Sequence, residues 1–525
     1  MLENLTFYLI LVIIIVLLVM LAKKIRVAYP VLLVLAGLGI SFIPGTPTIH
    51  IEPELIFFIF LPPLLYEAAW AASWKELWRW RRIVVSFAFV VVFITSLVVA
   101  FVANHFIPGF SLALGFLLGG IVSPPDAVSA GAILKFVKIP KRYSSILEGE
   151  SLLNDASSLI IFRFAMIAVA TGQFIWQEAA FSFLWMCIGG AGIGILLGIF
   201  FMKMHRLLPT DANIDIVLTL VAPFFMYLVA EELHASGVLA VVSGGLLLSN
   251  RSHSFLATSS RLGTLNVWSS LVFLLNGIVF MMIGLDLPQI VSGLETDLST
   301  AFGYGVLITV ILVITRIFAA YGAVFITMIM RNFITVADRQ NPGWKAPALI
   351  GWTGMRGVVS LAAALSIPLT LQDGTPFPHR NLILFITFVV ILLTLVVQGL
   401  TLPFLIKKFN IEDPDFTRSE KEIDYEIRNE LAKIAVKRIR DTHFEKLEKL
   451  PALQDQLQNW ENRVNSSQVI LNFPEYREIY LDIINQQREW LISKNRKEIL
   501  LDEEIVRKHL KMLDLQEEKL GMHYT

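Results

Sequence analysis

Charged residues are scarce in this sequence. They make up 16% of its 525 residues, whereas a soluble globular protein carries about 25%. Cysteine is nearly absent, because Cys187 stands alone, and an internal disulfide is therefore excluded. The region beyond residue 408 contains no phosphate-binding loop, nucleotide fingerprint or metal-spaced cysteines. We therefore expect no cofactor, no nucleic-acid partner and no enzyme activity.

Long apolar runs dominate the chain. Hydrophobic residues account for 55% of it, and runs of about 20 apolar residues, enough to cross a bilayer as a helix, recur from Leu5 to Ile406. The first run is too long for the core of a signal peptide and lacks a basic start, so we expect it to remain as a span. The sequence predicts an all-α polytopic membrane protein with thirteen transmembrane helices. They cover residues 5–22, 27–43, 54–72, 83–107, 110–135, 145–171, 179–202, 213–232, 235–249, 263–287, 299–330, 346–370 and 381–406.

The basic residues between the spans test this count. Twenty of them follow odd-numbered spans, whereas Arg380 alone falls on the other side. Cytoplasmic loops of membrane proteins carry the excess of Lys and Arg. We therefore expect the N-terminus outside the cell and the C-terminus in the cytoplasm.

The charge balance changes after Lys408. Up to this residue the chain carries 24 Lys and Arg against 19 Asp and Glu, and beyond it 19 against 24. The later residues include helix-like stretches at 420–449 and 475–520, with apolar residues at helical spacing. We predict a transmembrane domain over residues 1–408 and a cytoplasmic helical domain over residues 409–525, with a regulatory role and an unknown ligand.

Two spans carry residues that interrupt a helix. In the fifth span, Pro124 and Pro125 remove two backbone donors and precede Asp126. The twelfth span has three glycines within residues 351–357. The fifth span runs inward and the twelfth outward, so spans 1–6 and 8–13 would form two inverted repeats of six helices. Paired interruptions at matching positions are the best sequence indication of a transport site in secondary transporters.

Ionisable residues lie within several spans. Counted at about 1.5 Å per helical residue, several of them reach a common depth near the middle of the bilayer. Isolated charges there cost several kcal/mol each, so we expect them to face one another or water. The acids are Glu67, Asp126, Glu150 and Asp155, and the cations are Arg163, Arg316 and Arg356.

The densest polar stretch lies in the sixth span. Glu150, Ser151, Asn154 and Asp155 stand at i, i+1, i+4 and i+5, which groups them along one side of a helix. Hard oxygen ligands suit a small hard cation, and a carboxylate removed from water binds a proton more readily. One such carboxylate can take either ion in turn, which is the chemistry of antiport.

Each acid also has a structural interpretation. Glu150 lies nearer the cytoplasmic end of its span, and we expect it to pair with Arg356 and hold the bundle. Asp155 is expected to bind the ion. Asp126 keeps two interpretations: it balances the half-helix dipoles at the break, or it binds the ion directly.

The remaining intramembrane charges divide in the same way. Glu67 follows Pro62-Pro63 in another span disturbed by proline, and we expect it to be functional. Arg163 and Arg316 are expected to be structural or to snorkel toward the membrane interface.

Four motifs occur in the order and at the spacing of a known family. They are LPPLLYEAAW at 61–70, SPPDAVSA at 123–130, GESLLNDA at 149–156 and GMRGVVSLAAALSIP at 354–368. With these motifs the chain resembles the sodium/proton antiporters of the cation:proton antiporter superfamily. The matching branch holds the animal sodium/hydrogen exchangers and the NhaP-type antiporters of archaea and bacteria. The resemblance covers residues 5–408.

The resemblance implies a fold and an ion site. The fold has thirteen helices in two inverted repeats of six, with helices 5 and 12 unwound and crossed, and forms a homodimer whose core moves as an elevator. Asp155 matches the essential ion- and proton-binding residue, and Asn154 matches its partner. Ser151 and Glu67 match residues that ligate the transported Na+ together with this aspartate or shape its site.

The resemblance also assigns the remaining charges. Glu150 and Arg356 match an organising ion pair, and Asp126 matches the aspartate of the unwound segment. Many relatives have a threonine before this aspartate, whereas this chain has Pro125. A threonine oxygen is therefore absent as an ion ligand at this point.

The sequence thus predicts a multi-pass cation/proton antiporter of the plasma membrane. It would exchange Na+, with K+ and Li+ as further candidates, for H+, and its partners would be these ions, membrane lipid and a second copy of the chain. Asn154 in place of a second acid favours electroneutral 1:1 exchange, an expectation that rests on the resemblance. Two alternatives stay open: an ion-coupled symporter of small anions, and a channel or pH sensor that signals through the C-terminal domain.

Overall fold

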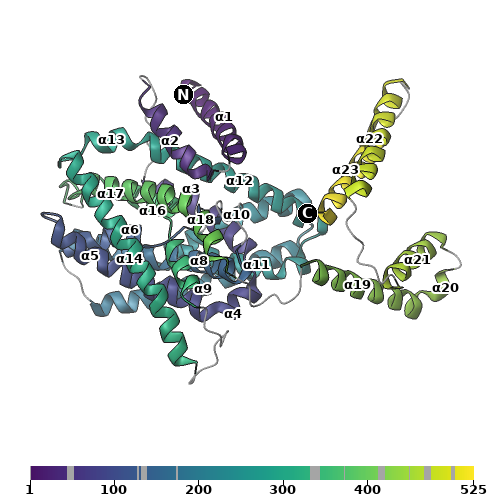
Figure 1. The fold of residues 1–525 in the computed structure, drawn as a ribbon, viewed down its shortest axis with the longest axis horizontal. Coiled ribbons are helices and arrows are strands. Elements are labelled where there is room, and N and C mark those ends of the chain that lie inside the picture. Colours follow the sequence, from purple (N-terminus) through teal and green to yellow (C-terminus); the bar gives the residue numbers. More distant parts are fainter. Residues whose placement is uncertain are drawn as a thin grey trace. The chain divides into compact units, whose positions relative to one another are not determined.

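The described part of the chain is built from helices. The computed structural model describes residues 2–25, 27–43, 53–126, 129–131, 139–172, 176–331, 343–371, 373–411, 420–447, 450–465, 474–497 and 503–524. These residues contain no β-strand, only one isolated bridge between Thr370 and Pro376 (Figure 1). The prediction of an all-α protein is therefore confirmed for the part that is described. The chain folds into two compact units, residues 1–413 and 414–525.

The first unit contains most of the helices. Two short π-helical segments, η1 (Ser86–Val91) and η2 (Thr394–Gln398), lie within longer helical stretches. The α-helices are α1 (Leu2–Ile25), α2 (Tyr29–Ser41), α3 (Pro53–Ala71), α4 (Trp74–Val85), α5 (Val92–Phe106), α6 (Leu112–Val122), α8 (Lys141–Thr171), α9 (Trp176–Leu207), α10 (Ala212–Glu232), α11 (Gly237–Phe255), α12 (Thr258–Leu285), α13 (Leu287–Ser292), α14 (Leu298–Met330), α15 (Lys345–Trp352), α16 (Val358–Leu365), α17 (Arg380–Leu393) and α18 (Gly399–Phe409).

Eight helical stretches among the described residues are long and apolar enough to cross a membrane. Three shorter apolar helices, α2, α6 and the end of α3, accompany them. A span interrupted by proline or glycine cannot reach that length as one helix, and this applies to the predicted fifth and twelfth spans. The count of thirteen spans therefore stays a prediction. The eight stretches are Thr6–Ile25, Trp74–Phe106, Lys141–Thr171, Ala180–Leu207, Ala212–Glu232, Thr258–Ser292, Leu298–Ile329 and Arg380–Phe409.

The helix of the fourth span begins earlier than its apolar run. α4 continues through η1 into α5 and ends at Phe106. Ser73 caps its start, where the hydroxyl oxygen accepts the backbone N–H of Glu76 at 3.5 Å. In α4 the side chains of Trp80 and Val84 are buried. The amphipathic helix α4, which carries the basic residues, therefore extends the apolar span at its N-terminal end.

The helix α6 is packed closely against α5. A Cβ atom on Gly115 would lie 2.6 Å from the carbonyl oxygen of Ala100, and one on Gly119 would lie 2.6 Å from that of Ser96. Small residues four positions apart allow membrane helices to approach in this way. At the end of α6, the hydroxyl groups of Ser96 and Ser123 share a hydrogen bond of 2.9 Å. This packing holds α6 in place up to the residue where it stops.

The second unit consists of helices that pair by charge and by apolar contact. Arg440 on α19 contacts Glu461 on α21 at 2.7 Å. Arg488 on α22 contacts Asp514 on α23 at 2.8 Å. The buried side chains of Ile484 on α22 and Leu513 on α23 belong to one apolar cluster. The helices of this unit are α19 (Glu420–Thr442), α20 (Phe444–Leu447), α21 (Pro451–Asn465), α22 (Pro474–Lys497) and α23 (Glu503–Tyr524).

Candidate functional site

Both spans that were expected to be interrupted are interrupted. α6 ends at Val122, and the non-helical residues 123–126 form the first break. α15 ends at Trp352, α16 begins at Val358, and residues 353–357 form the second break. Two consecutive prolines favour the first break, because they donate no hydrogen bond and clash with the preceding turn. The pair Pro62-Pro63, by contrast, lies within the continuous helix α3. Two glycines in the second break favour a non-helical backbone there.

The two breaks lie against each other. The backbone N–H of Asp126 in the first break donates to the carbonyl oxygen of Met355 in the second break at 2.7 Å. Each break thus satisfies a backbone group that the other has lost from a helix, as broken helices within a membrane require. That the breaks belong to two inverted repeats stays a prediction.

The Arg356 side chain links the two breaks by hydrogen bonds to backbone carbonyl oxygens. This side chain is fully buried. The guanidinium donates to the carbonyl oxygens of Val122 (2.7 Å), Ser123 (3.2 Å) and Gly354. Its backbone N–H donates to the Thr394 hydroxyl oxygen at 3.2 Å. The cation therefore faces the C-terminal end of α6, where freed carbonyls carry partial negative charge.

The structure gives Glu150 a different hydrogen-bonded partner from the expected Arg356. Glu150 on α8 is fully buried and forms a bidentate pair with Arg316 on α14, at 2.7 and 2.9 Å. Arg356 is instead occupied by the backbone carbonyls that the first break frees. A buried carboxylate needs one committed cation with good geometry, and α14 supplies it. Arg316 is thus structural, as one of its two expected roles allowed.

Asp126 is the last described residue of the first break. Its Oδ2 accepts the backbone N–H of Ser129 at 3.3 Å and the Ser129 hydroxyl at 2.5 Å. This is the bonding pattern of a residue that caps a helix start. The carboxyl group also lies directly against the Cα of Gly357, where α16 begins. The geometry favours the interpretation that Asp126 balances half-helix dipoles, and a direct ion role stays a prediction.

Asn154 and Asp155 reach the breaks from α8. The Asn154 side-chain amide donates to the carbonyl oxygen of Pro125 at 3.2 Å. Its Oδ1 is buried without a hydrogen-bond partner in the described part of the chain. Asp155 is buried as well, and within the described residues its carboxylate has no hydrogen bond or ion pair. Asp126 lies close enough to interact with it electrostatically. A carboxylate and an amide oxygen thus remain available beside the first break.

The structure places the other expected ligands around this point. Ser151 lies one helical turn before Asp155 on α8. Glu67 lies on α3, and both Glu67 and Asp126 interact electrostatically with Tyr29 of α2. These residues supply oxygen atoms of the kind that Na+ prefers. That these five residues form one ion site stays a prediction, as do their individual roles.

Tyr29 is a residue that sequence reasoning missed. It stands at the start of α2, before Pro30 at the first turn. A tyrosine at the end of an apolar run is typical of a membrane interface, so nothing in the pattern distinguishes it. Only the folded structure brings Tyr29 within electrostatic range of Glu67 and Asp126.

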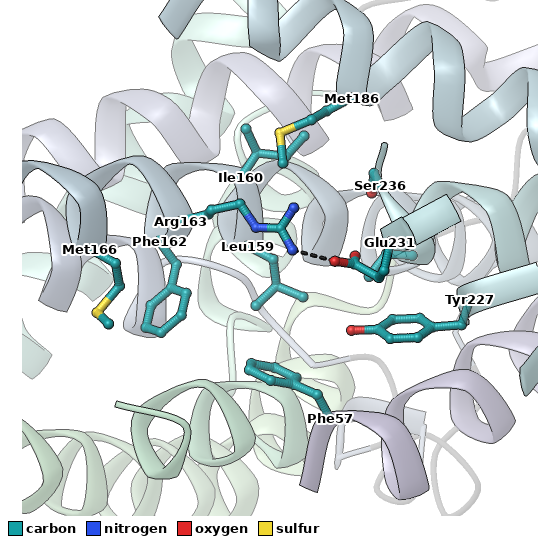
Figure 2. A pocket seen from close by; sticks show the side chains of 11 residues that line it. Phe57, Leu159, Ile160, Phe162, Arg163, Met166, Met186, Tyr227, Glu231 and Ser236 are labelled. Carbon is teal, nitrogen blue, oxygen red and sulfur yellow. Dashed lines mark hydrogen bonds and ion pairs between the residues drawn. The ribbon is translucent and has the colours of Figure 1, made fainter. Parts of the chain in front are cut away.

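A further ion pair was also missed. Arg163 on α8 contacts Glu231 on α10, where the two side chains face each other across a cavity (Figure 2). The cavity has a volume of ≈ 240 Å³ and is also bordered by Tyr227, Phe57 and Ser236. An acid within the predicted eighth span was the signal that would have identified Glu231. Arg163 is thus paired rather than directed to the interface.

A third polar group closes the ends of three helices. His205 on α9 and Asp215 on α10 are buried, with 2.7 Å between Nδ1 and Oδ1. The second oxygen of Asp215 accepts the hydroxyl of Ser260 on α12 at 2.7 Å. Asp215 thus links His205 to Ser260, and the three residues come from helices that the sequence did not connect.

The arrangement is that of a membrane transporter with broken helices, and comparison with known proteins identifies the family. The family model for the transmembrane sodium/hydrogen exchanger matches residues 10–408. The chain belongs to this family, and the resemblance carried by the four motifs is confirmed. The C-terminal unit lies beyond the matched residues.

Named relatives agree with the family. The chain is 37% identical over 390 residues to a sodium, potassium, lithium and rubidium/H+ antiporter of Bacillus pumilus, covering 72% of this chain and 58% of the relative. It is 36% identical over 393 residues to the Na+/H+ antiporter ApNhaP of Aphanothece halophytica, covering 74% of this chain and 70% of the relative. The match thus spans little more than half the length of the Bacillus protein.

A solved structure has the same fold. The sodium proton antiporter MjNhaP1 of Methanocaldococcus jannaschii at pH 8 superimposes with a TM-score of 0.63 and 19% identity, covering 78% of this chain and 99% of that one. Together with the apolar helices, family membership makes this chain a multi-pass membrane protein of a transporter family. Which end faces the cytoplasm stays a prediction.

Proposed function

We propose that this chain exchanges Na+ for H+ across the plasma membrane, with the Asp155 carboxylate binding the cation and the proton in turn. One observation carries the proposal. The Asp155 carboxylate is buried beside the first break and has no hydrogen bond or ion pair within the described residues. The neighbouring charges are already committed, because Glu150 is paired with Arg316 and Arg356 with backbone carbonyls.

A carboxylate in this position favours exchange over simple binding. Its charge cannot stay uncompensated in a buried site, because an isolated charge within the membrane costs several kcal/mol. Either a proton or a monovalent cation neutralises it, and the two exclude each other on one carboxylate. The site can then move between the two sides of the membrane only when a proton or a cation neutralises the carboxylate, and this couples the two ion fluxes.

The oxygen atoms around Asp155 suit a small cation. The proposed ligands are the Asp155 carboxylate, the Ser151 hydroxyl and Glu67, with the unpartnered Oδ1 of Asn154 as a neutral ligand beside them. Hard oxygen donors of this kind select alkali cations over softer metals. The cation is the cargo of the site, and no resident metal is needed.

The neutral side chain of Asn154 supports a 1:1 stoichiometry, as the family resemblance implies. This side chain is neutral in both states and is anchored to the Pro125 carbonyl by its amide group. A single carboxylate then carries one cation one way and one proton back. We therefore propose electroneutral 1:1 exchange.

The contacts of the site support movement as one body. α8 is tied to α14 by Glu150–Arg316 and to the first break by Asn154. The second break is tied to α6 by Arg356. We propose that these elements move together as the core of an elevator in a homodimer, as the family resemblance implies, with the N-terminus outside and the C-terminus in the cytoplasm.

The anion symport alternative is not favoured. A small carboxylate substrate would need a cationic ligand that is free at the site. The two arginines nearest the breaks are both engaged, Arg316 by a carboxylate and Arg356 by carbonyl oxygens. The broken helices are therefore better suited to a cation.

Transport in proteoliposomes tests the proposal. The purified chain is reconstituted, and proton movement is measured with a pH-sensitive dye after Na+, K+, Li+ or Rb+ is added in turn. We expect saturable proton counterflow driven by Na+, at a rate that is the same when the membrane potential is clamped at different values. Counterflow that tracks the potential would refute electroneutrality, and the absence of counterflow with every cation would refute antiport.

A further inference from the structure

The Arg163–Glu231 pair lies in a cavity on the same face of α8 as Asp155. Leu159, Phe162 and Met166 line the cavity, and they follow Asp155 at i+4, i+7 and i+11. Positions at this spacing lie along one side of a helix. The cavity therefore begins one turn beyond Asp155, about 6 Å along the helix axis, and Arg163 lies about 12 Å along it.

Several helices border the cavity, which is open on one side. Phe57 of α3 and Met186 of α9 border it, together with Tyr227 of α10 and Ser236 and Val238 at the start of α11. Figure 2 shows the Arg163 guanidinium directed at Glu231, with the Tyr227 hydroxyl turned toward the same space. Under the predicted topology, this is the part of α8 toward the outside of the cell.

The ion pair between Arg163 and Glu231 is weak enough to separate. The Arg163 side chain is 41% exposed and that of Glu231 is 27% exposed, and partly exposed ion pairs are weak because water and salt compete for them. Glu231 keeps a second anchor, since its Oε1 accepts the backbone N–H of Gly237 at 3.2 Å. The carboxylate therefore stays in place when the long arginine side chain leaves. Tyr227 lies one turn before it and contributes a neutral oxygen.

We propose that this cavity is the outer vestibule of the transport path, in which the Glu231 carboxylate binds a monovalent cation in exchange for the Arg163 guanidinium. The cation then continues along α8 to Asp155. With the pair closed, the vestibule carries no net charge and does not hold cations strongly. Arg163 thus competes with the external cation for the Glu231 carboxylate and raises the cation concentration that half-saturates the vestibule. The proposal rests on the cation/proton exchange proposed above.

The test compares the two sides of the membrane. Right-side-out and inverted vesicles are prepared from host cells without Na+/H+ exchange of their own, and the Na+ concentration for half-maximal proton flux is measured from each side. We expect Arg163→Gln to lower this concentration at the outer side by about two- to five-fold and Glu231→Gln to raise it by about the same factor. The half-saturating concentration at the inner side and the maximal rate should stay at wild-type values.

The matched control is the neighbouring acid Glu232, which is exposed and does not line the cavity. Glu232→Gln removes the same charge one residue away and should leave both sides unchanged. Because the vestibule is partly exposed, the difference between Arg163→Gln and wild type should shrink when an impermeant organic cation raises the ionic strength. A pair that merely fastens α8 to α10 would show no such dependence.

The outcomes separate the vestibule from the exchange activity. Wild-type exchange with outer half-saturation unchanged in both Arg163→Gln and Glu231→Gln would overturn the vestibule alone, as would equal shifts on both sides. A wild-type chain that moves no protons with any alkali cation would overturn the exchange activity itself. If a single variant assembles poorly, the double variant R163Q/E231Q removes both charges, and we expect its outer half-saturation to lie between those of the single variants. A double variant that matched either single variant would contradict the exchange of partners.

Discussion

The contact between Asp126 and Gly357 gives a sharp prediction about the two breaks. Replacing Gly357 by alanine adds a methyl group where the carboxyl group of Asp126 lies. The new carbon would be 2.5 Å from Cγ and 2.9 Å from Cβ of Asp126, and closer still to Oδ2. Non-bonded carbon atoms normally lie about 3.5–4.0 Å apart, so one of the two breaks must shift.

The cost of this shift can be bounded. Asp126 cannot simply rotate away, because its carboxylate holds the backbone and hydroxyl groups of Ser129. Its backbone is also tied to Met355. Overpacking in a well-packed interior costs about 1–3 kcal/mol. We therefore expect Gly357→Ala to lower the midpoint of thermal unfolding in detergent and to reduce the exchange rate in proteoliposomes.

The control is a glycine with space around it. A Cβ on Gly303 of α14 would meet nothing within 4 Å. Because alanine favours a helix over glycine by about 1 kcal/mol, Gly303→Ala should leave stability unchanged or raise it, with wild-type exchange. Wild-type stability and wild-type exchange in Gly357→Ala would refute the contact between the breaks as described here.

Three further predictions concern the charges around the breaks. Arg316→Gln leaves the buried Glu150 carboxylate without its partner and should cost about 3–5 kcal/mol in stability; an unchanged thermal unfolding midpoint would contradict the pair. Arg356→Gln deprives three backbone carbonyls of their donor, so the yield of monodisperse protein in size-exclusion chromatography should fall. A well-assembled Arg356→Gln variant with selective loss of Na+ binding would reverse its structural assignment. Asn154→Asp adds a second titratable carboxylate and should make exchange depend on the clamped membrane potential; potential-independent exchange in this variant would count against the proposed origin of electroneutrality.

The positions of the breaks were predictable only in part. Pro124 and Pro125 cannot donate hydrogen bonds, but the pair Pro62-Pro63 lies within α3, which continues unbroken from Pro53 to Ala71. Two prolines therefore favour a break without deciding it. The glycines of the second break favour it for another local reason, because glycine loses more backbone entropy in a helix than other residues do. The set Glu150, Ser151, Asn154 and Asp155 could likewise be placed along one side of a helix from its i, i+1, i+4 and i+5 spacing.

The partners of the arginines were not predictable in the same way. Counting residues along a span gives depth in the membrane but not rotation about the helix axis, and rotation decides which groups meet. Arg356 and Glu150 were expected to pair, yet Arg356 faces the carbonyls freed by the first break, and Arg316 reaches Glu150 from α14. Arg163 and Glu231 are separated by 68 positions in the chain, and only the folded arrangement of the helices brings them together.

The number of spans shows a related limit. Hydropathy identifies a long apolar run whether or not its helix is continuous. The predicted twelfth span is one run in the sequence, whereas the structure divides it into α15 and α16, each of 8 residues. Counting only long continuous helices therefore gives fewer spans than counting apolar runs in the sequence.

The central claim is that one carboxylate, Asp155, holds either a cation or a proton. It is tested most directly by the protons released when Na+ binds to the purified chain in a weakly buffered solution with a pH indicator. We expect about one proton for each Na+ bound, at a pH where the site is protonated, since a proton and a cation cannot share one carboxylate. Asp155→Asn should release none while eluting as well-assembled protein. Undiminished proton release from Asp155→Asn, or Na+ binding to the wild type without any proton release, would contradict the account.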